Sequence, residues 1–169
     1  MKKVILVALT LVVVLSGVLY SGQFSAAAAK EFTILEFNTM VGVPAGLTGT
    51  QSPIRNINGG GLPWTLDSAQ GELKASGKLE LSVQGLVLAA GANAGSNPIG
   101  NFRAVVSCLS GNGSVVNIAT DPFPATTGPA SAGGGDAKVE VTLSLPQPCI
   151  APIIFVTSPG GNWFAVTGN

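Results

Sequence analysis

Apolar and polar residues alternate along much of the chain, most clearly over residues 137–145. Valine or leucine occupies every second position from Val139 to Leu145; a lysine precedes this series, and glutamate, threonine and serine alternate with it. This period of two is typical of an antiparallel strand with one face on the core and the other in water. The pattern predicts a half-buried strand over these residues.

Residues 71–88 show the same alternation on both sides of a short polar stretch, which predicts a β-hairpin. Two registers keep the leucines on one face. One register pairs Lys74 with Glu80, and the other, shifted by two residues, sets Glu72 opposite Glu80. Like charges directly opposite each other are destabilising. The charges therefore predict the register that pairs Lys74 with Glu80.

Six more segments have strand-like alternation, and after residue 30 no segment has the 3.6-residue period of a helix. In one of them Cys108 shares a face with Phe102, and we expect that face to point inward. Many short strands with Gly and Pro between them predict an all-β fold. We expect an antiparallel β-sandwich, Ig-like in general architecture, with eight or nine strands. The six segments are 32–40, 62–67, 102–109, 114–119, 153–157 and 163–167.

The first 29 residues have the order of an export signal, with Lys2 and Lys3 before an apolar run at 4–20 and small residues at 27–29. This order predicts a signal helix, cleavage after Ala29 and a location outside the cytosol, secreted or periplasmic. The alternative is an uncleaved anchor, which would attach the protein to a membrane through this segment alone; the run is at the lower length limit for a span. We divide the rest into residues 30–61, an N-terminal strand and a Gly/Pro-rich loop, and residues 62–169, the remainder of one β-domain.

Cys108 and Cys149 are the only cysteines. An even number of cysteines in an exported chain predicts a disulfide. The alternative is a reactive thiol or a metal-binding pair, but the chain has no histidine to complete a metal site. We therefore expect one disulfide and no metal.

The absence of histidine also removes the usual general base and the Ser-His-Asp and Cys-His arrangements. No phosphate-binding loop and no nucleophile motif occurs in the sequence. Without the signal, six Lys and Arg stand against eight Asp and Glu, so no basic patch indicates nucleic-acid binding. We expect no catalytic residue and no cofactor, with a histidine-free hydrolase that uses two carboxylates as the alternative.

Three stretches rich in Gly, Pro, Ser and Thr, at 42–61, 89–101 and 122–135, are predicted to be loops. Loops on a rigid scaffold commonly carry binding residues. We expect the second and third loops to form a contact surface at one end of the sandwich, and Asn97 is a candidate binding residue in the second.

Arg103 and Trp163 are further candidates. Arg103 alternates with the inward face of its strand and is expected to point outward, where it would bind an anion or a partner. An ion pair with an acid on a neighbouring strand is the favoured interpretation of this arginine. Trp163 follows a turn and would serve as a sugar-binding platform if exposed, but packing in the core is the favoured interpretation of its ring.

From residue 62 onward the chain resembles small exported bacterial proteins with no assigned activity. The resemblance implies bacterial export and a shared fold, and it assigns no catalytic residue. It rests on Gly61-Leu-Pro-Trp64, Gln84-Gly-Leu-Val-Leu88, Asn97-Pro, Phe102-Arg-Ala-Val-Val-Ser-Cys108, Asp121-Pro-Phe-Pro-Ala125, Cys149-Ile-Ala-Pro152 and Phe155-Val-Thr-Ser-Pro-Gly-Gly-Asn-Trp-Phe164.

Together these features predict an exported, disulfide-linked β-protein that acts by binding or structural association in the cell envelope or outside the cell, with a partner that the sequence does not identify. A self-assembling surface or fibre subunit is the second hypothesis. Charged residues make up only 9% of the chain, and the apolar stretch at 150–157 could pair with another chain if its edge were uncovered.

Overall fold

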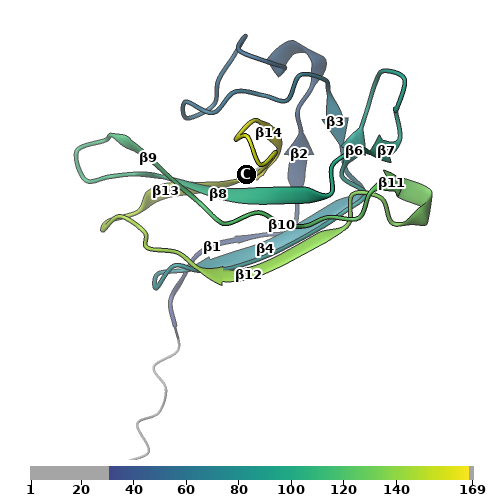
Figure 1. Ribbon diagram of the computed structural model, residues 1–169. Helices are drawn as coiled ribbons and strands as arrows, with labels where there is room; N and C mark the ends of the chain where they lie inside the picture. Colours follow the sequence, from purple (N-terminus) through teal and green to yellow (C-terminus); the bar gives the residue numbers. More distant parts are fainter. Residues whose placement is uncertain (1–30, 168–169) are drawn as a thin grey trace, which may run out of the picture.

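Short antiparallel strands are the main regular elements of the computed structural model, which describes residues 31–167 (Figure 1). The predicted signal segment lies outside these residues. In the described part the only helical elements are two short 3₁₀ turns, η1 (Ala45–Leu47) and η2 (Ala130–Ala132). None of its helices is long and apolar enough to cross a membrane. The predicted all-β class is confirmed.

The lower sheet in Figure 1 has four strands in the order β1-β4-β5-β12. All three pairings are antiparallel. The predicted strand at 137–145 is present as β12 and ends three residues earlier than expected. The strands are β1 (Thr33–Phe37), β4 (Ser68–Lys74), β5 (Lys78–Gln84) and β12 (Ala137–Thr142).

The upper sheet has six strands in the order β10-β8-β13-β14-β2, with β9 also paired to β8. They are β10 (Phe123–Pro124), β8 (Asn101–Leu109), β13 (Ile150–Thr157), β14 (Trp163–Thr167), β2 (Met40–Gly42) and β9 (Val115–Ala119).

Four two-residue strands form two further pairs, β3 with β6 and β7 with β11. The structure therefore has more strands than the eight or nine expected, because stretches predicted as loops contain short paired segments. These strands are β3 (Trp64–Thr65), β6 (Val87–Leu88), β7 (Ser96–Asn97) and β11 (Gly128–Pro129).

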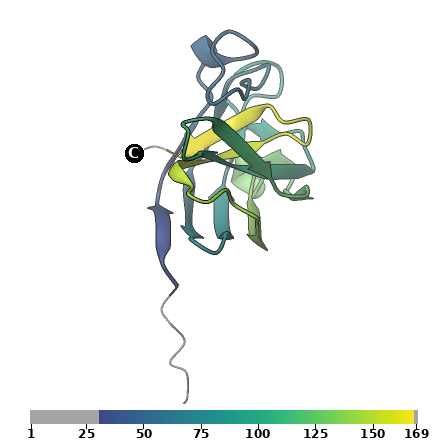
Figure 2. The ribbon, with the colours of Figure 1, turned by 90° about the vertical axis from the view of Figure 1, so that its left-hand side faces the viewer.

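The two main sheets lie one over the other in both views of the ribbon (Figures 1 and 2). Buried side chains from both sheets form one continuous core. Phe102 and Cys108, predicted to share an inward face, have no exposed surface. At one end of the core the ring of Phe102 meets Trp64 and Phe164 edge-on, with centroids 6.4 and 5.9 Å away, and the latter two rings stack at 4.0 Å.

The first predicted strand, 32–40, is divided between the two sheets. Its first part forms β1 in the lower sheet, and after a bend at Asn38 the chain enters β2 in the upper sheet. On another side, an antiparallel bridge between Ala125 and Ala137 connects the stretch after β10 to the start of β12. The two sheets are therefore linked by backbone as well as by side-chain packing.

The hairpin of β4 and β5 has the register that the charges disfavoured. Leu73 lies opposite Leu79, and Glu72 lies opposite Glu80. The prediction was wrong because turn geometry outweighs the charges. This register leaves a three-residue loop that ends on Gly77, whose φ is +92°. A glycine in the left-handed region is favoured at that place in a three-residue hairpin loop.

Ion pairs within and beside the hairpin offset the repulsion between the facing glutamates. Lys74 pairs with Glu72 at 2.5 Å along the same strand, and Lys78 pairs with Glu80 at 2.7 Å and with Glu140 at 3.0 Å. The prediction considered only residues directly opposite each other, whereas long lysine side chains also reach neighbours along the strand and diagonally across it.

Acid is expected to weaken this sheet. Hydrogen bonding to Lys78, followed by the attraction of its charge, lowers the pKa of Glu80 below its ordinary value of 4.5. A carboxylate with a lowered folded-state pKa contributes stability above its unfolded-state pKa, and that contribution is lost as the pH falls through the folded-state value.

We expect the midpoint of urea unfolding to decrease when the pH is lowered below about 4.5, and we expect Glu80→Gln to remove part of this dependence. Asp121→Asn, which changes an exposed acid outside the ion pairs of residues 31–167, is the control. The same acid response in both variants would contradict the assignment.

The stretch predicted as the first loop covers the outer face of the upper sheet, and we call residues 43–61 the cover segment (Figure 1, top). Gly60 N donates to Trp163 O, and Trp163 N donates to Asn58 O, both at 2.8 Å. Phe155 and Trp163, which meet on this face, are both buried. Part of the upper sheet is therefore buried on both faces.

Candidate functional site

The second and third predicted loops meet as expected. Strand β7 pairs with β11, which places Asn97 opposite Gly128. Next to this pair, Ala130 N donates to Gly95 O at 3.0 Å. The two loops are therefore held together by backbone hydrogen bonds, which gives this end of the molecule a defined shape.

Asn97 joins the two loops from within. Its side chain is 1% exposed, and its Nδ2 donates to Ile99 O and to Thr126 O, each at 2.8 Å. Its Oδ1 accepts a hydrogen bond from Ile99 N at 3.0 Å. The amide of Asn97 uses both of its polar atoms to hold the two loops together, so it stabilises the shape of this surface.

Two glycines bring the end of the third loop against its neighbours. A Cβ on Gly134 would lie 1.8 Å from Gly128 O, and one on Gly135 would lie 2.3 Å from Leu86 O. These are backbone atoms that cannot move aside, so any larger residue would push the loop away. The close approach places Asp136 at the start of β12 beside the end of β5.

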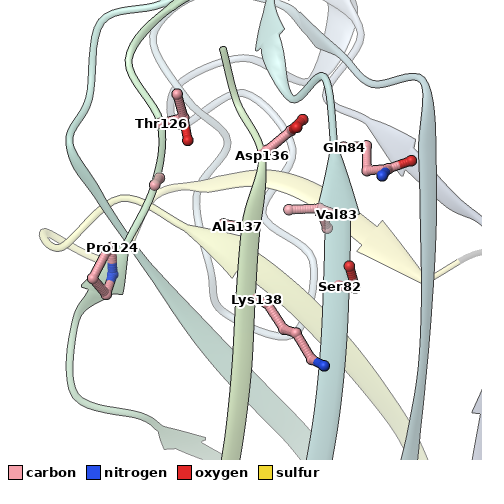
Figure 3. Close-up of a pocket in the computed structure, with 9 residues that line it drawn as sticks. Ser82, Val83, Gln84, Pro124, Thr126, Asp136, Ala137 and Lys138 are labelled. Carbon is pink, nitrogen blue, oxygen red and sulfur yellow. The ribbon is translucent and has the colours of Figure 1, made fainter. Parts of the chain in front are cut away.

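An open groove of about 410 Å³ lies next to this junction (Figure 3). Strand β5 and the start of β12 supply one part of its lining, and the stretch at 124–126 supplies the other. Figure 3 shows Gln84 and Asp136 near one end of the groove, and Lys138 and Ser82 farther along the two strands. The lining residues are Ser82, Val83, Gln84, Pro124, Ala125, Thr126, Asp136, Ala137 and Lys138.

The groove presents several kinds of polar group. Asp136 Oδ1 accepts a hydrogen bond from Gly85 N at 2.9 Å, and Gln84 Oε1 accepts one from Ser68 Oγ at 2.9 Å. Lys138 is exposed and forms no ion pair within residues 31–167. A cation, a carboxylate, an amide and hydroxyl groups along one groove suit a polar ligand that forms hydrogen bonds.

Arg103 lies outside the groove. It is half-buried on β8, opposite Thr157 of β13, and its Nε is buried without a hydrogen-bond partner. Within residues 31–167 the ion pairs involve only lysines, so the ion pair expected for Arg103 is not formed there.

Trp163 is 1% exposed, and its ring lies 6.3 Å from that of Phe155, centroid to centroid. The ring packs inside the protein, as the favoured interpretation expected, and offers no exposed platform to a sugar. Arg103 and Trp163 are both paired with Thr157 of β13 and so lie in one row across the upper sheet, whereas Asn97 lies at the junction of the loops.

Glutamates form a row across the outer face of the lower sheet because β1, β4, β5 and β12 place Glu36, Glu72, Glu80 and Glu140 opposite one another. The first three line a second hollow, of about 370 Å³. The row was missed from the sequence because the predicted register paired Glu80 with a lysine.

A glycosidase needs one of its two carboxyls to be protonated and the other ionised. In this hollow Glu72 is paired with Lys74, and the pKa of Glu80 is lowered, which keeps it ionised. The ion pair with Lys78 and the lowered pKa of Glu80 favour its ionised form over the protonated form of a general acid. Within residues 31–167 no group of three or more acidic, cysteine or histidine side chains is arranged to hold a metal ion.

The predicted disulfide between Cys108 and Cys149 is present and joins residues 41 positions apart. It connects the end of β8 to the residue before β13. Both thiols are used, so neither is available as a nucleophile or metal ligand in this state. The bond is consistent with an oxidising compartment outside the cytosol.

No protein family matches the chain, and no curated protein and no solved structure matches it. A function must therefore be argued from the chemistry of the surfaces themselves. Sequence reasoning located the loop junction but missed the groove residues Gln84, Asp136 and Lys138. Their only signal was polarity on a strand face, which surface exposure explains equally well.

Proposed function

We propose that the protein is an exported bacterial β-sandwich, Ig-like in general architecture, that binds a polar partner in the cell envelope or outside the cell without catalysing a reaction. The order of residues 1–29, the disulfide and the resemblance to small exported bacterial proteins support export. The groove beside the loop junction carries the binding proposal, because it is hollow, polar and built on a frame of paired strands.

The fixed arrangement of the two loops distinguishes a binding site from an ordinary polar stretch of surface. Asn97 and the close approach of Gly134 and Gly135 fix the loops before any partner arrives. A preformed site loses little conformational freedom when it binds, so more of the interaction energy remains as affinity. Lys138, which forms no ion pair within residues 31–167, gives the groove a point of attraction for a negatively charged group.

A non-enzymatic role is supported by the chemistry of both hollows. In the groove, the carboxylate of Asp136 accepts a hydrogen bond from backbone, and no histidine exists to activate Ser82 or Thr126. In the second hollow, Lys74 and Lys78 neutralise Glu72 and Glu80. The histidine-free hydrolase therefore has less support than a binding module.

Binding to the native envelope tests the groove. Purified protein with its disulfide intact is mixed with envelope fragments of its host and sedimented. From the retained fraction at a series of fragment concentrations, we expect Gln84→Ala combined with Lys138→Gln to raise the Kd by about tenfold, the effect of roughly 1.4 kcal/mol of binding energy. Gln51→Ala, which changes an exposed glutamine in the cover segment, is the matched control and should bind as the wild type does. Absence of wild-type retention, or equal retention by the groove variant, would overturn the proposal.

The export proposal has its own measurement. Mass spectrometry of protein purified from the host should show an N-terminus at Lys30 and a mass about 2 Da below that of the reduced chain, because a disulfide removes two hydrogens. An intact N-terminus with a membrane-bound protein would support the anchor, and recovery from the cytosol with free thiols would contradict export.

A self-assembling surface subunit is the second candidate. The stretch at 150–157 does not provide the uncovered edge considered for it, because β13 is paired with β8 on one side and with β14 on the other. One edge of the lower sheet favours assembly instead. Within residues 31–167, β1 pairs only with β4, and Phe32 beside it is 72% exposed. An uncovered strand edge is able to pair with another chain. Sedimentation velocity of the processed protein separates the two roles, because a single monomeric species at high concentration would contradict self-assembly.

A further inference from the structure

Backbone strain gathers at one place in the cover segment. The non-glycine residues with positive φ in residues 31–167 are Arg55, Asn56 and Ala151, with φ values of 49°, 66° and 45°. Arg55 and Asn56 form a two-residue turn that Ile54 and Ile57 close with hydrogen bonds of 3.1 and 2.9 Å. A two-residue hairpin turn requires positive φ at both positions, which Asn56 tolerates, whereas a long side chain such as that of Arg55 rarely adopts this region.

The strained turn and the strained residue of β13 touch each other. Arg55 Nη2 donates a hydrogen bond to Ala151 O at 3.1 Å. The main chain of the same arginine is held from the other side, because Asn117 Nδ2 donates to Arg55 O at 2.8 Å. Arg55 is therefore fixed between β9 and β13, on the outer face of the upper sheet.

Ser107 of β8 lies between these two strands. It is directly opposite Asn117 of β9 on one side and Ile153 of β13 on the other. Residues directly opposite each other in antiparallel strands project from the same face. Ser107 therefore projects from the face that bears Asn117, on the strand between the two that Arg55 contacts.

Two polar atoms at this place have no partner. The side chain of Ser107 has no exposed surface, and neither its Oγ nor the buried Nη1 of Arg55 forms a hydrogen bond. Arg55 also has no ion pair within residues 31–167. A guanidinium is always charged and donates only, so Nη1 requires an acceptor that the described part of the chain does not supply. Buried polar groups without a partner are costly and indicate an ion or water that the protein takes up.

We propose that Arg55 and Ser107 bind a small oxyanion, the carboxylate or phosphate group of a ligand, at the edge of the cover segment. Arg55 Nη1 and the hydroxyl of Ser107 each donate one hydrogen bond to the anion, while Nη2 keeps its bond to Ala151. Charge-assisted bonds from arginine to an oxyanion are among the stronger hydrogen bonds in proteins, and they compensate for the positive φ of Arg55. This site is formed by β8, β9, β13 and the cover segment, whereas the groove is formed by β5, β12 and residues 124–126.

Anion titrations of the full, disulfide-bonded chain test the proposal. Sodium phosphate and sodium acetate are added separately, in exchange for chloride at constant ionic strength, while backbone amide resonances are recorded by NMR. We expect saturable shifts that centre on Arg55, Ser107 and Asn117. Saturation by phosphate alone identifies a phosphoryl ligand, and saturation by acetate identifies a carboxylate.

Variants separate this site from general effects of salt. Arg55→Gln and Ser107→Ala should each weaken binding of the anion by about tenfold. Lys74→Gln, which removes a cation from β4 in the lower sheet, should leave the affinity unchanged. The wild-type titration decides the proposal if Arg55→Gln does not fold. Shifts that do not saturate, or that persist unchanged in Ser107→Ala, would overturn it and assign the two atoms to bound water.

Discussion

Replacing Phe102 by alanine is expected to lower the free energy of unfolding by about 3–5 kcal/mol, the cost usual for removing a buried aromatic ring from a core. Phe102 has no exposed surface and stands between Trp64 and Phe164. The cavity cannot collapse easily, because β8 is paired with neighbours on both sides. Urea unfolding followed by tryptophan fluorescence measures the loss, and Trp64 reports directly on the cluster.

Phe32→Ala is the matched control for this substitution. Phe32 is 72% exposed, so the same chemical change there should shift the stability by less than about 0.5 kcal/mol, as is usual on a surface. A loss below about 1 kcal/mol for Phe102→Ala would mean that the end of the core is loosely packed.

Removal of the disulfide is expected to cost about 4 kcal/mol. Cys108 and Cys149 close a loop of 41 residues, and the chain-entropy relation gives about this value for such a loop. The double substitution Cys108→Ala with Cys149→Ala removes the bond without placing a hydroxyl in the core, where Cys108 has no exposed surface. Urea unfolding gives the difference, and the denaturant slope should rise because the unfolded chain becomes more extended.

Reduction of the wild-type protein provides the control for this measurement. Dithiothreitol should bring the wild type close to the stability of the double variant and should leave the double variant unchanged. Small domains have total stabilities of about 5–15 kcal/mol, so this loss would leave little margin. Equal stability of oxidised and reduced protein would show that the strand pairing alone restricts the chain, and it would remove a principal reason for export to an oxidising compartment.

Strand positions could be predicted well from the sequence where one face is buried. In β8, Phe102 and Cys108 share the buried face that alternation predicted, and β12 begins where its pattern begins. Alternation works because a strand that slips by one residue would turn its whole apolar face to water. The division of residues 32–40 into β1 and β2 could not be found in this way, because a strand that changes sheets keeps its local pattern.

The register of the hairpin shows where local reasoning fails. A shift by two residues keeps every leucine inward, so burial does not choose between the alternatives. The charges of Lys74 and Glu80 indicated one register, and the loop that ends at Gly77 imposed the other. The row of glutamates and the hollow beside it follow from that register.

The candidate sites depended even more on distant contacts. Asn97 was identified from its loop, but its role in joining that loop to Thr126 required the pairing of β7 and β11. The alternation of residues 137–145 predicts only that Lys138 faces water. No local pattern indicates that Pro124 and Thr126 line the same groove. No sequence pattern indicates a role for Arg55, because its backbone conformation and its contacts with β9 and β13 exist only in the folded chain.

The sequence by itself determined the all-β class, most of the strands and the face of β8 that is buried, because alternation can be read within a single segment. It also determined the disulfide, because two cysteines allow only one pairing. Only the tertiary structure decided the register of the hairpin, the cover over the upper sheet and the two polar sites. The cover and the two polar sites depend on residues more than ten positions apart, and such contacts leave no periodic trace in the chain. The register depends on the geometry of a three-residue loop, which alternation does not distinguish because a shift by two residues preserves it.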